Sequence, residues 1–165
     1  MWGRQTCACC VLALGAALGV GAPVAVAQDV GVQFRGDALD PDPGESRKHR
    51  EQVVDFLAGL IREAATDCIE HDQTLSVTVS GLRLSGREPL HDNPEQTRRA
   101  SATDWPRMDV EWTLKNAHGH VVASESETLT DREYLERHAI RGSARPLPAE
   151  HHMVREWVSR SVCSP

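Results

Sequence analysis

An apolar segment near the N-terminus constrains this chain more than any other feature of its sequence. Residues 11–22 are all apolar or small, and one basic residue, Arg4, precedes them. Pro23 interrupts the run, and Ala25-Val-Ala27 follows it. A basic start, an apolar core and a small-x-small end are the three parts of a cleavable secretory signal. We therefore expect residues 1–27 to be removed on export.

Two alternatives to a cleaved signal are a membrane anchor and a lipid anchor. A membrane-spanning helix needs about 20 apolar residues, and this run is shorter and is broken by Pro23. Lipidation of an exported protein would need a cysteine just after the apolar segment, but Cys7, Cys9 and Cys10 all precede it. The sequence therefore favours cleavage over either anchor.

The expected mature chain, residues 28–165, has the size of one domain and can bury a substantial core. The whole chain has a formal net charge of −6, and loss of Arg4 with the signal changes it to −7. Nucleic acids and anionic membranes repel such a charge. We expect neither as a partner after cleavage. The oligomeric state is left open.

Two cysteines, Cys68 and Cys163, remain after cleavage. An even number of cysteines in an exported chain predicts a disulfide bond. A bridge that closes a loop of roughly 100 residues stabilises a fold by about 4–5 kcal/mol at most, by constraining the unfolded chain. The alternative is two separate thiols, with Cys68 as a small buried apolar residue. The oxidising compartment favours the bridge.

The first half of the mature chain predicts a strand, a helix and a second strand. Residues 30–35 alternate between apolar and polar, and Asp40-Pro-Asp-Pro-Gly44 predicts a loop. Ser46 is a suitable N-cap for a helix. The apolar face of that helix consists of Val53, Phe56, Leu57, Leu60, Ala64 and Cys68. Residues 75–84 alternate again, and a change of parity at Gly81 predicts a β-bulge.

The second half predicts a hairpin and helices after a long polar loop at about residues 85–104. Residues 108–115 and 121–129 form the hairpin around a turn at 116–119. Thr130-x-x-Glu133 has the pattern of a capping box and predicts a short helix that Gly142 ends. Pro148 suits the first turn of a C-terminal helix, whose apolar residues include Val154, Trp157, Val158 and Val162.

The order β-α-β-β-β-α-α predicts an α+β fold, in which a small antiparallel sheet of about four strands is covered on one face by two or three helices. The direction of the first strand is left open. The opposite face of the sheet would expose Ser76, Thr78, Asp109, Glu111 and Thr113. Cys163 lies off the apolar stripe of the last helix, so its pairing with Cys68 requires the helix end to fray.

Two pairs of histidines could contribute ligands to a zinc or copper site. His118 and His120 lie in the predicted hairpin turn, where turn chemistry explains them equally well. His151 and His152 are adjacent on a helix and point about 100° apart, since a helical turn takes about 3.6 residues. The sequence contains no four-ligand spacing of a known kind, so we expect no bound metal and no other cofactor.

The acidic residues favour a solvated surface over a catalytic pair. Asp109 and Glu111 share one face of their strand, and we expect Glu125 and Glu127 opposite them on the hairpin. Acid–base catalysis would need burial to separate their pKa values. No nucleophile elbow and no phosphate-binding loop is present. Of the tryptophans, Trp112 and Trp157 belong to apolar stripes, whereas Trp105 would lie at the edge of the loop.

Several segments in order resemble the domain of unknown function 3016 family, exported Gram-negative bacterial proteins without an assigned activity. The matching segments are Gln73-Thr-Leu-Ser-Val-Thr-Val79, Trp105-Pro-Arg-Met-Asp-Val110, Gly119-His-Val-Val-Ala-Ser124, Leu129-Thr-Asp131, Tyr134-Leu135 and Trp157. The resemblance implies an exported single-domain protein of unassigned activity. It transfers no catalytic, ligand or cysteine residue.

These patterns favour a non-enzymatic periplasmic module that binds a protein or another component of the envelope, with its exposed sheet face and the 85–104 loop as the contact surface. One alternative is a small hydrolase-like enzyme whose Asp, Glu and His groups converge only in the fold. The other is a metal-binding periplasmic protein. A pocket with a buried carboxylate or imidazole beside the loop would favour the enzyme.

Overall fold

A computed structural model describes residues 29–39, 46–86, 101–137 and 145–164. The predicted signal, the predicted loop at 40–44, most of the 85–104 loop and Gly142 lie outside the described residues. Among the described helices, none is both long and apolar enough to cross a lipid bilayer.

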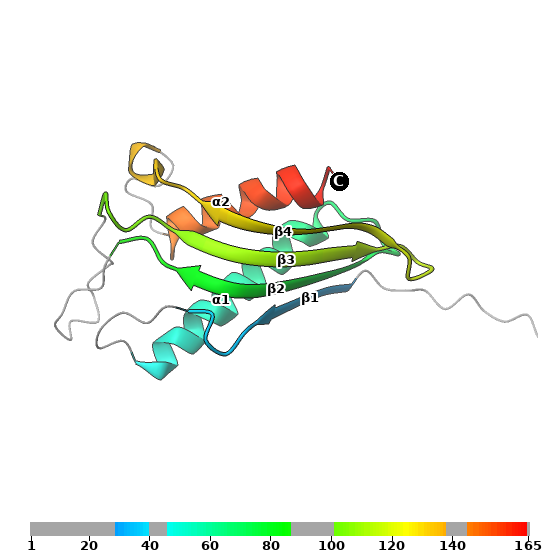
Figure 1. Ribbon diagram of the computed structural model, residues 1–165, viewed down its shortest axis with the longest axis horizontal. Helices are drawn as coiled ribbons and strands as arrows, with labels where there is room; N and C mark the ends of the chain where they lie inside the picture. Colours follow the sequence, from blue (N-terminus) through cyan, green and yellow to red (C-terminus); the bar gives the residue numbers. More distant parts are fainter. Residues whose placement is uncertain (1–28, 40–45, 87–100, 138–144, 165) are drawn as a thin grey trace, which may run out of the picture.

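Four strands form one sheet in the order β1-β2-β3-β4 (Figure 1). The strands are β1 (Asp29–Phe34), β2 (Thr74–Arg83), β3 (Arg107–Lys115) and β4 (Val121–Thr130). The last three are antiparallel neighbours, whereas β1 is parallel to β2. The predicted α+β class and element order are confirmed, with the correction that the sheet is mixed. A parallel neighbour needs a long crossover connection, and the first helix provides it.

Helices α1 (Arg47–Thr66) and α2 (Pro148–Trp157) lie on the same face of the sheet, and no described helix lies over the opposite face (Figure 1). The predicted N-cap of α1 is confirmed, because the Ser46 hydroxyl accepts a hydrogen bond of 3.1 Å from the His49 backbone N–H. Pro148 occupies the first turn of α2, as predicted. The helix layer therefore decides which face of the sheet is buried.

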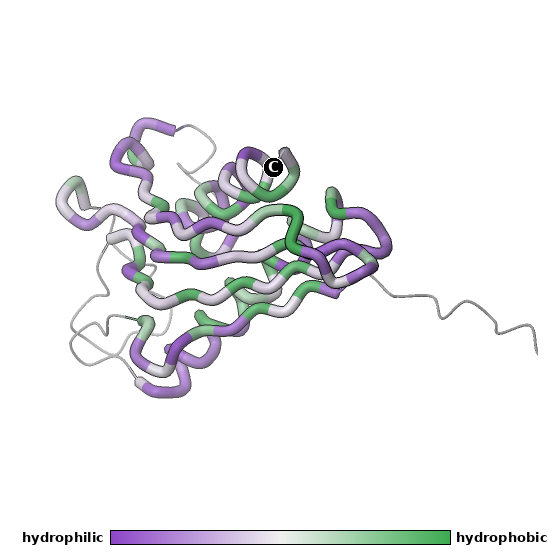
Figure 2. Tube along the Cα trace, turned by 45° about the vertical axis from the view of Figure 1, so that its right-hand side comes forward, coloured by the Kyte–Doolittle hydropathy of each residue, from purple (hydrophilic) through white to green (hydrophobic). Residues whose placement is uncertain are grey.

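The core fills the space between the helices and the sheet. Alternate residues of the central strands point into it, and Figure 2 shows the alternation of hydrophobic and hydrophilic residues along the strands. The largest fully buried side chains are Trp157, Leu57, Ile61, Leu75, Met108, Leu114, Glu150, Val77, Val79, Val110, Val154 and Val158. Trp112 is also buried, so both tryptophans predicted for the core lie there.

The predicted β-bulge at Gly81 is confirmed. Val79 pairs with Val110 and Gly81 pairs with Asp109, so Ser80 is the extra residue. The extra residue restores Leu82 to the buried face after the parity change. The bulge also places Gly81 directly beside Asp109 on the uncovered face.

Two local predictions were wrong. Thr130 is the last residue of β4 and caps no helix, and the turn after it is a 3-10 helix, η1 (Tyr134–Glu136), without a side-chain cap. Instead, the Asp131 carboxylate accepts a hydrogen bond of 3.1 Å from the Glu133 N–H. The first long helix ends at Thr66, so Cys68 lies in the following turn and is exposed instead of buried on the helix face.

A disulfide joins Cys68 to Cys163, with the two Cα atoms 5.5 Å apart. The apolar stripe implied that the end of the last helix would have to fray for this bond to form, but the helix does not fray. It widens into a π-helical turn, η2 (Val158–Val162), which directly precedes Cys163. A π-helical turn contains one residue more than an α-helical turn, so it rotates the following residues around the axis. This rotation accounts for the direction in which Cys163 points.

Candidate functional site: the uncovered face of the sheet

The uncovered face of the sheet consists of the residues that alternate with the core residues. We define it as Gly31, Gln33, Ser76, Thr78, Ser80, Gly81, Arg83, Arg107, Asp109, Glu111, Thr113, Ser124, Ser126, Thr128 and Thr130. The five residues predicted for this face all lie on it. Hydroxyl groups dominate the surface, and its acids and arginines are concentrated toward the end of β2 and the start of β3.

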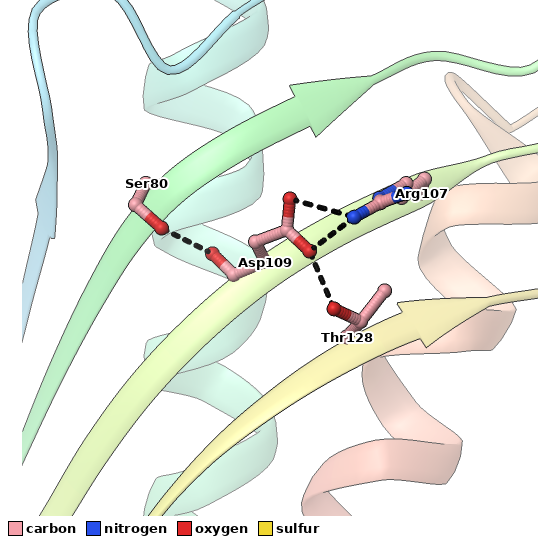
Figure 3. A network of polar contacts seen from close by, with 4 residues as sticks. All are labelled: Ser80, Arg107, Asp109 and Thr128. Carbon is pink, nitrogen blue, oxygen red and sulfur yellow. Dashed lines mark hydrogen bonds and ion pairs between the residues drawn. The ribbon is translucent and has the colours of Figure 1, made fainter.

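Asp109 is the centre of a hydrogen-bond network on this face (Figure 3). Its carboxylate accepts bonds from the Thr128 hydroxyl at 2.6 Å and from the Arg107 guanidinium at 3.1 Å. The bulge residue Ser80 donates to the Asp109 carbonyl at 3.5 Å. The Thr128 bond lowers the pKa of Asp109, partial burial opposes this, and Arg107 adds to the lowering. Asp109 is therefore a fixed anion and a poor proton donor at neutral pH.

Gly81 has no side chain, and a side chain at this position would collide with the network. A Cβ at Gly81 would lie 2.5 Å from an Asp109 carboxylate oxygen. We predict that Gly81→Ala lowers the free energy of unfolding by about 1–2 kcal/mol, because it displaces the carboxylate from its partners. Urea denaturation would measure the loss. Gly31→Ala is the matched control, since the nearest atom there is 3.9 Å away.

The close approach of position 81 to Asp109 also predicts that substitutions at these two positions are energetically coupled. In an Asp109→Ala background the same Gly81→Ala change should have little effect, because the carboxylate that it displaces is gone. Equal losses in both backgrounds would mean that strand propensity at position 81, and not contact with Asp109, explains the result.

The prediction that Glu125 and Glu127 face Asp109 and Glu111 was wrong. The register pairs Asp109 with Thr128 and Glu111 with Ser126, so the two glutamates of β4 point toward the helices. Glu111 instead pairs with Arg35 at 3.2 Å. Glu125 and Glu127 therefore add no carboxylate to the uncovered face, where Asp109 and Glu111 each pair with an arginine.

Glu127 lies between β4 and the last helix, where it binds two buried indoles. One carboxylate oxygen accepts bonds of 3.0 Å from both the Trp112 and the Trp157 N–H. The other accepts a bond of 3.1 Å from Ser161 and lies 3.5 Å from Arg160. Burial raises the pKa of Glu127, but these hydrogen bonds and the arginine charge together lower it further than burial raises it. The group holds the helix layer to the edge of the sheet.

This lowered pKa predicts a pH dependence of stability. A carboxyl whose pKa is lower in the folded than in the unfolded chain stabilises the fold above its ordinary pKa, and this contribution is lost as pH falls through the folded value. The difference in unfolding free energy between wild type and Glu127→Gln should therefore be constant near neutral pH and shrink in acid. Urea denaturation at several values of pH would test this, and a difference independent of pH would contradict it.

A buried carboxylate does lie beside the start of the 85–104 loop. Glu150 is completely buried and accepts a hydrogen bond of 2.5 Å from the Ser85 backbone N–H. It lines neither of the two cavities described below. Glu150 therefore has the burial expected of a catalytic acid, but the contact that it makes is structural, because it anchors the start of the loop to α2.

The described residues line at least two cavities. The first, of about 190 Å³, lies between the end of β4 and α2, and its charged residues pair with each other or with neighbours: Asp131 with Arg137 at 2.7 Å, and Arg160 with Glu127. The second, of about 460 Å³, lies between α1 and the start of α2. Its lining contains one imidazole, His151, and no Ser, Cys or Lys. Neither cavity assembles a nucleophile with a base.

The four histidines that could have supplied metal ligands lie at separate places in the fold. His118 and His120 stack with ring centroids 6.1 Å apart in the hairpin turn, where both backbone N–H groups bond to the Asn116 side chain. His151 lines the second cavity, and His152 pairs with Glu156 at 3.4 Å. Within the described part of the chain, no three His, Cys, Asp or Glu residues are placed to hold a metal ion.

Trp105 lies at the edge of the loop and is partly exposed, as predicted, but the sequence did not indicate its two arginine neighbours. The Arg83 guanidinium carbon lies 5.6 Å from the ring centroid, and that of Arg132 lies 4.9 Å from it. The two arginines are 49 positions apart in the sequence, so no local pattern could have indicated that they share one ring.

Comparison with known proteins places the chain in a family. The family described as "Protein of unknown function (DUF3016)" matches residues 29–160. This chain belongs to that family. No curated protein matches it. Among solved structures, two crystal forms of the PelC dodecamer from Paraburkholderia phytofirmans, one of them a point variant, share 16% and 15% identity with it. Each alignment covers 82% of this chain and 88% of the other, with a TM-score of 0.35, too low to support an inference.

Proposed function

We propose that this DUF3016 protein is an exported, non-enzymatic binding module of the periplasm, and that the uncovered face of its sheet contacts an envelope protein. The observation that carries the proposal is the asymmetry of the sheet, since α1 and α2 cover one face and no helix within the described ranges covers the other (Figure 1). A polar face held in a fixed hydrogen-bond network needs no reorganisation on binding, which lowers the cost of association.

The site chemistry supports binding more than catalysis. The Asp109 network fixes hydroxyl and carboxylate groups on a sheet surface. The fully buried acid, Glu150, lines neither described cavity. The alternation of Ser76 and Thr78 with buried neighbours leaves their hydroxyls toward the uncovered face, where they can donate or accept hydrogen bonds.

Site-specific photo-crosslinking in intact cells tests this function. A photoreactive amino acid replaces Thr78 or Ser126 on the uncovered face, and Arg62 on α1 in the control variant. We expect one envelope protein to be crosslinked from both sheet positions and not from the helix position. Crosslinks of equal yield from both faces, or none above background, would contradict the proposal.

A further inference from the structure

One end of the uncovered face brings three arginines together around a tryptophan. Arg83 ends β2, Arg107 begins β3, and Arg132 follows β4 by two residues. A hydrogen bond of 3.4 Å from the Asp131 N–H to the Pro106 carbonyl holds the last two segments together. In Figure 1 the end of β2, the start of β3 and the end of β4 lie at the same end of the sheet. We call these three arginines and Trp105 the arginine cluster.

The arginine cluster places like charges beside each other. Arg83 and Arg107 are direct register partners on β2 and β3, an arrangement that destabilises a sheet when both residues carry the same charge. Arg83 and Arg132 also share the Trp105 ring. The mutual repulsion of these cations would be relieved by an anion placed among them.

Only one of the three arginines is neutralised within the described part of the chain. Arg107 pairs with Asp109 at 3.1 Å and remains about half exposed. Arg83 and Arg132 have the Trp105 ring as their contact and no carboxylate at ion-pairing distance among the described residues. Within a chain of acidic net charge, Arg83 and Arg132 therefore present two positive charges that no described carboxylate pairs with, although Asp104 and Glu133 adjoin the same segments.

The ring contacts leave the arginines able to bind oxyanions. A cation–π contact involves the face of the indole and consumes no acceptor oxygen. Each guanidinium has five N–H donors in a planar fork that matches a carboxylate in a bidentate geometry. Contact with Trp105 also restricts both side chains before binding, which reduces the entropy that they lose on binding.

We propose that the arginine cluster binds the carboxylates of an acidic segment of the partner protein. This inference rests on the proposed function and names the chemistry of the partner. A protein segment fits better than a nucleic acid or an anionic membrane, because the net charge of this chain repels an extended polyanion. A segment with a few carboxylates gains the local attraction without that repulsion. The adjacent hydroxyl of Thr130 lies on the same face for its backbone, whereas the Thr128 hydroxyl already donates to Asp109.

Titration of the mature protein with a blocked hexaglutamate peptide, followed by calorimetry and by the indole resonance of Trp105, tests the site. We expect saturable binding that weakens as salt is added. Arg83→Gln with Arg132→Gln should weaken it about tenfold, as expected for two exposed charge pairs of up to about 1 kcal/mol each. Lys48→Gln with Arg62→Gln, on α1, makes the same change of net charge and should leave the affinity unchanged.

Four outcomes would overturn the inference: no saturable binding, equal weakening by both double variants, inorganic phosphate binding as tightly as the peptide, or stronger binding to phosphatidylglycerol vesicles. The crosslinking experiment separates this failure from failure of the proposed function. If the sheet positions still crosslink one partner with undiminished yield in the Arg83→Gln, Arg132→Gln protein, the binding module stands and the acidic segment is wrong. If the crosslink is lost in the Arg83→Gln, Arg132→Gln protein but kept in the Lys48→Gln, Arg62→Gln protein, the result supports both the binding module and the acidic segment.

Discussion

Replacing Glu127 with leucine is expected to lower the free energy of unfolding by about 3 kcal/mol. The reason is that Trp112 and Trp157 both donate to one Glu127 oxygen, and both indoles are buried. A buried donor that loses its acceptor costs about 1–3 kcal/mol. The side chain of Glu127 is 20% exposed, so water can replace part of the loss, which keeps the expected value below the sum of two full penalties.

Urea denaturation followed by circular dichroism would measure this loss. Glu127→Gln keeps an acceptor oxygen and should lose about 1 kcal/mol, the difference between a charged and a neutral hydrogen bond. Glu125→Leu is the control, because Glu125 is exposed on the same strand, and it should change stability by less than about 0.5 kcal/mol. If Glu127→Leu behaved like this control, the carboxylate would not be holding the indoles.

Removing both cysteines of the Cys68–Cys163 bond is expected to lower the free energy of unfolding by about 3–4 kcal/mol. The two positions are 95 apart in the sequence. The bond thus ties the turn after α1 to the end of η2 and restricts most of the chain when it unfolds. The variant for this measurement is Cys68→Ser with Cys163→Ser, compared with the oxidised wild type by urea denaturation.

A reducing agent provides the matched control for the disulfide prediction. Dithiothreitol should bring the wild type to the stability of the double serine variant and leave the variant itself unchanged. Thiol titration of the unfolded, unreduced mature protein should find no free thiol. Two titratable thiols, or a wild type that is insensitive to reduction, would show that the bond is absent in solution.

Periodicity predicted those parts of the fold in which one face of an element is buried. The alternation in β2 and β3 determined which residues face the helices, and the parity change at Gly81 located the bulge. The direction of β1 could not be derived, because alternation is the same in parallel and antiparallel strands. The π-helical turn before Cys163 was not predicted, because helical periodicity assumes 3.6 residues in every turn.

The site was predicted less completely than the fold. The five predicted residues do lie on the uncovered face, but Glu125 and Glu127 were assigned to it although they share parity with the buried Leu129. Counting back from Leu129 in steps of two would have located them correctly. The need of two core indoles for an acceptor was a further signal. No pattern in the sequence indicated the arginine cluster, because three separate segments form it.

The direction of the β4 glutamates also affects how the sheet ends. β4 is an edge strand, and its backbone could template a strand from another molecule, beginning beside the exposed Val121 and Val122. Charged residues that point inward from an edge strand are a known protection against such growth, because an added strand would have to cover them. Glu127 is such a residue. We therefore expect the carboxylate that holds two indoles in place to disfavour the addition of a foreign strand at this edge as well.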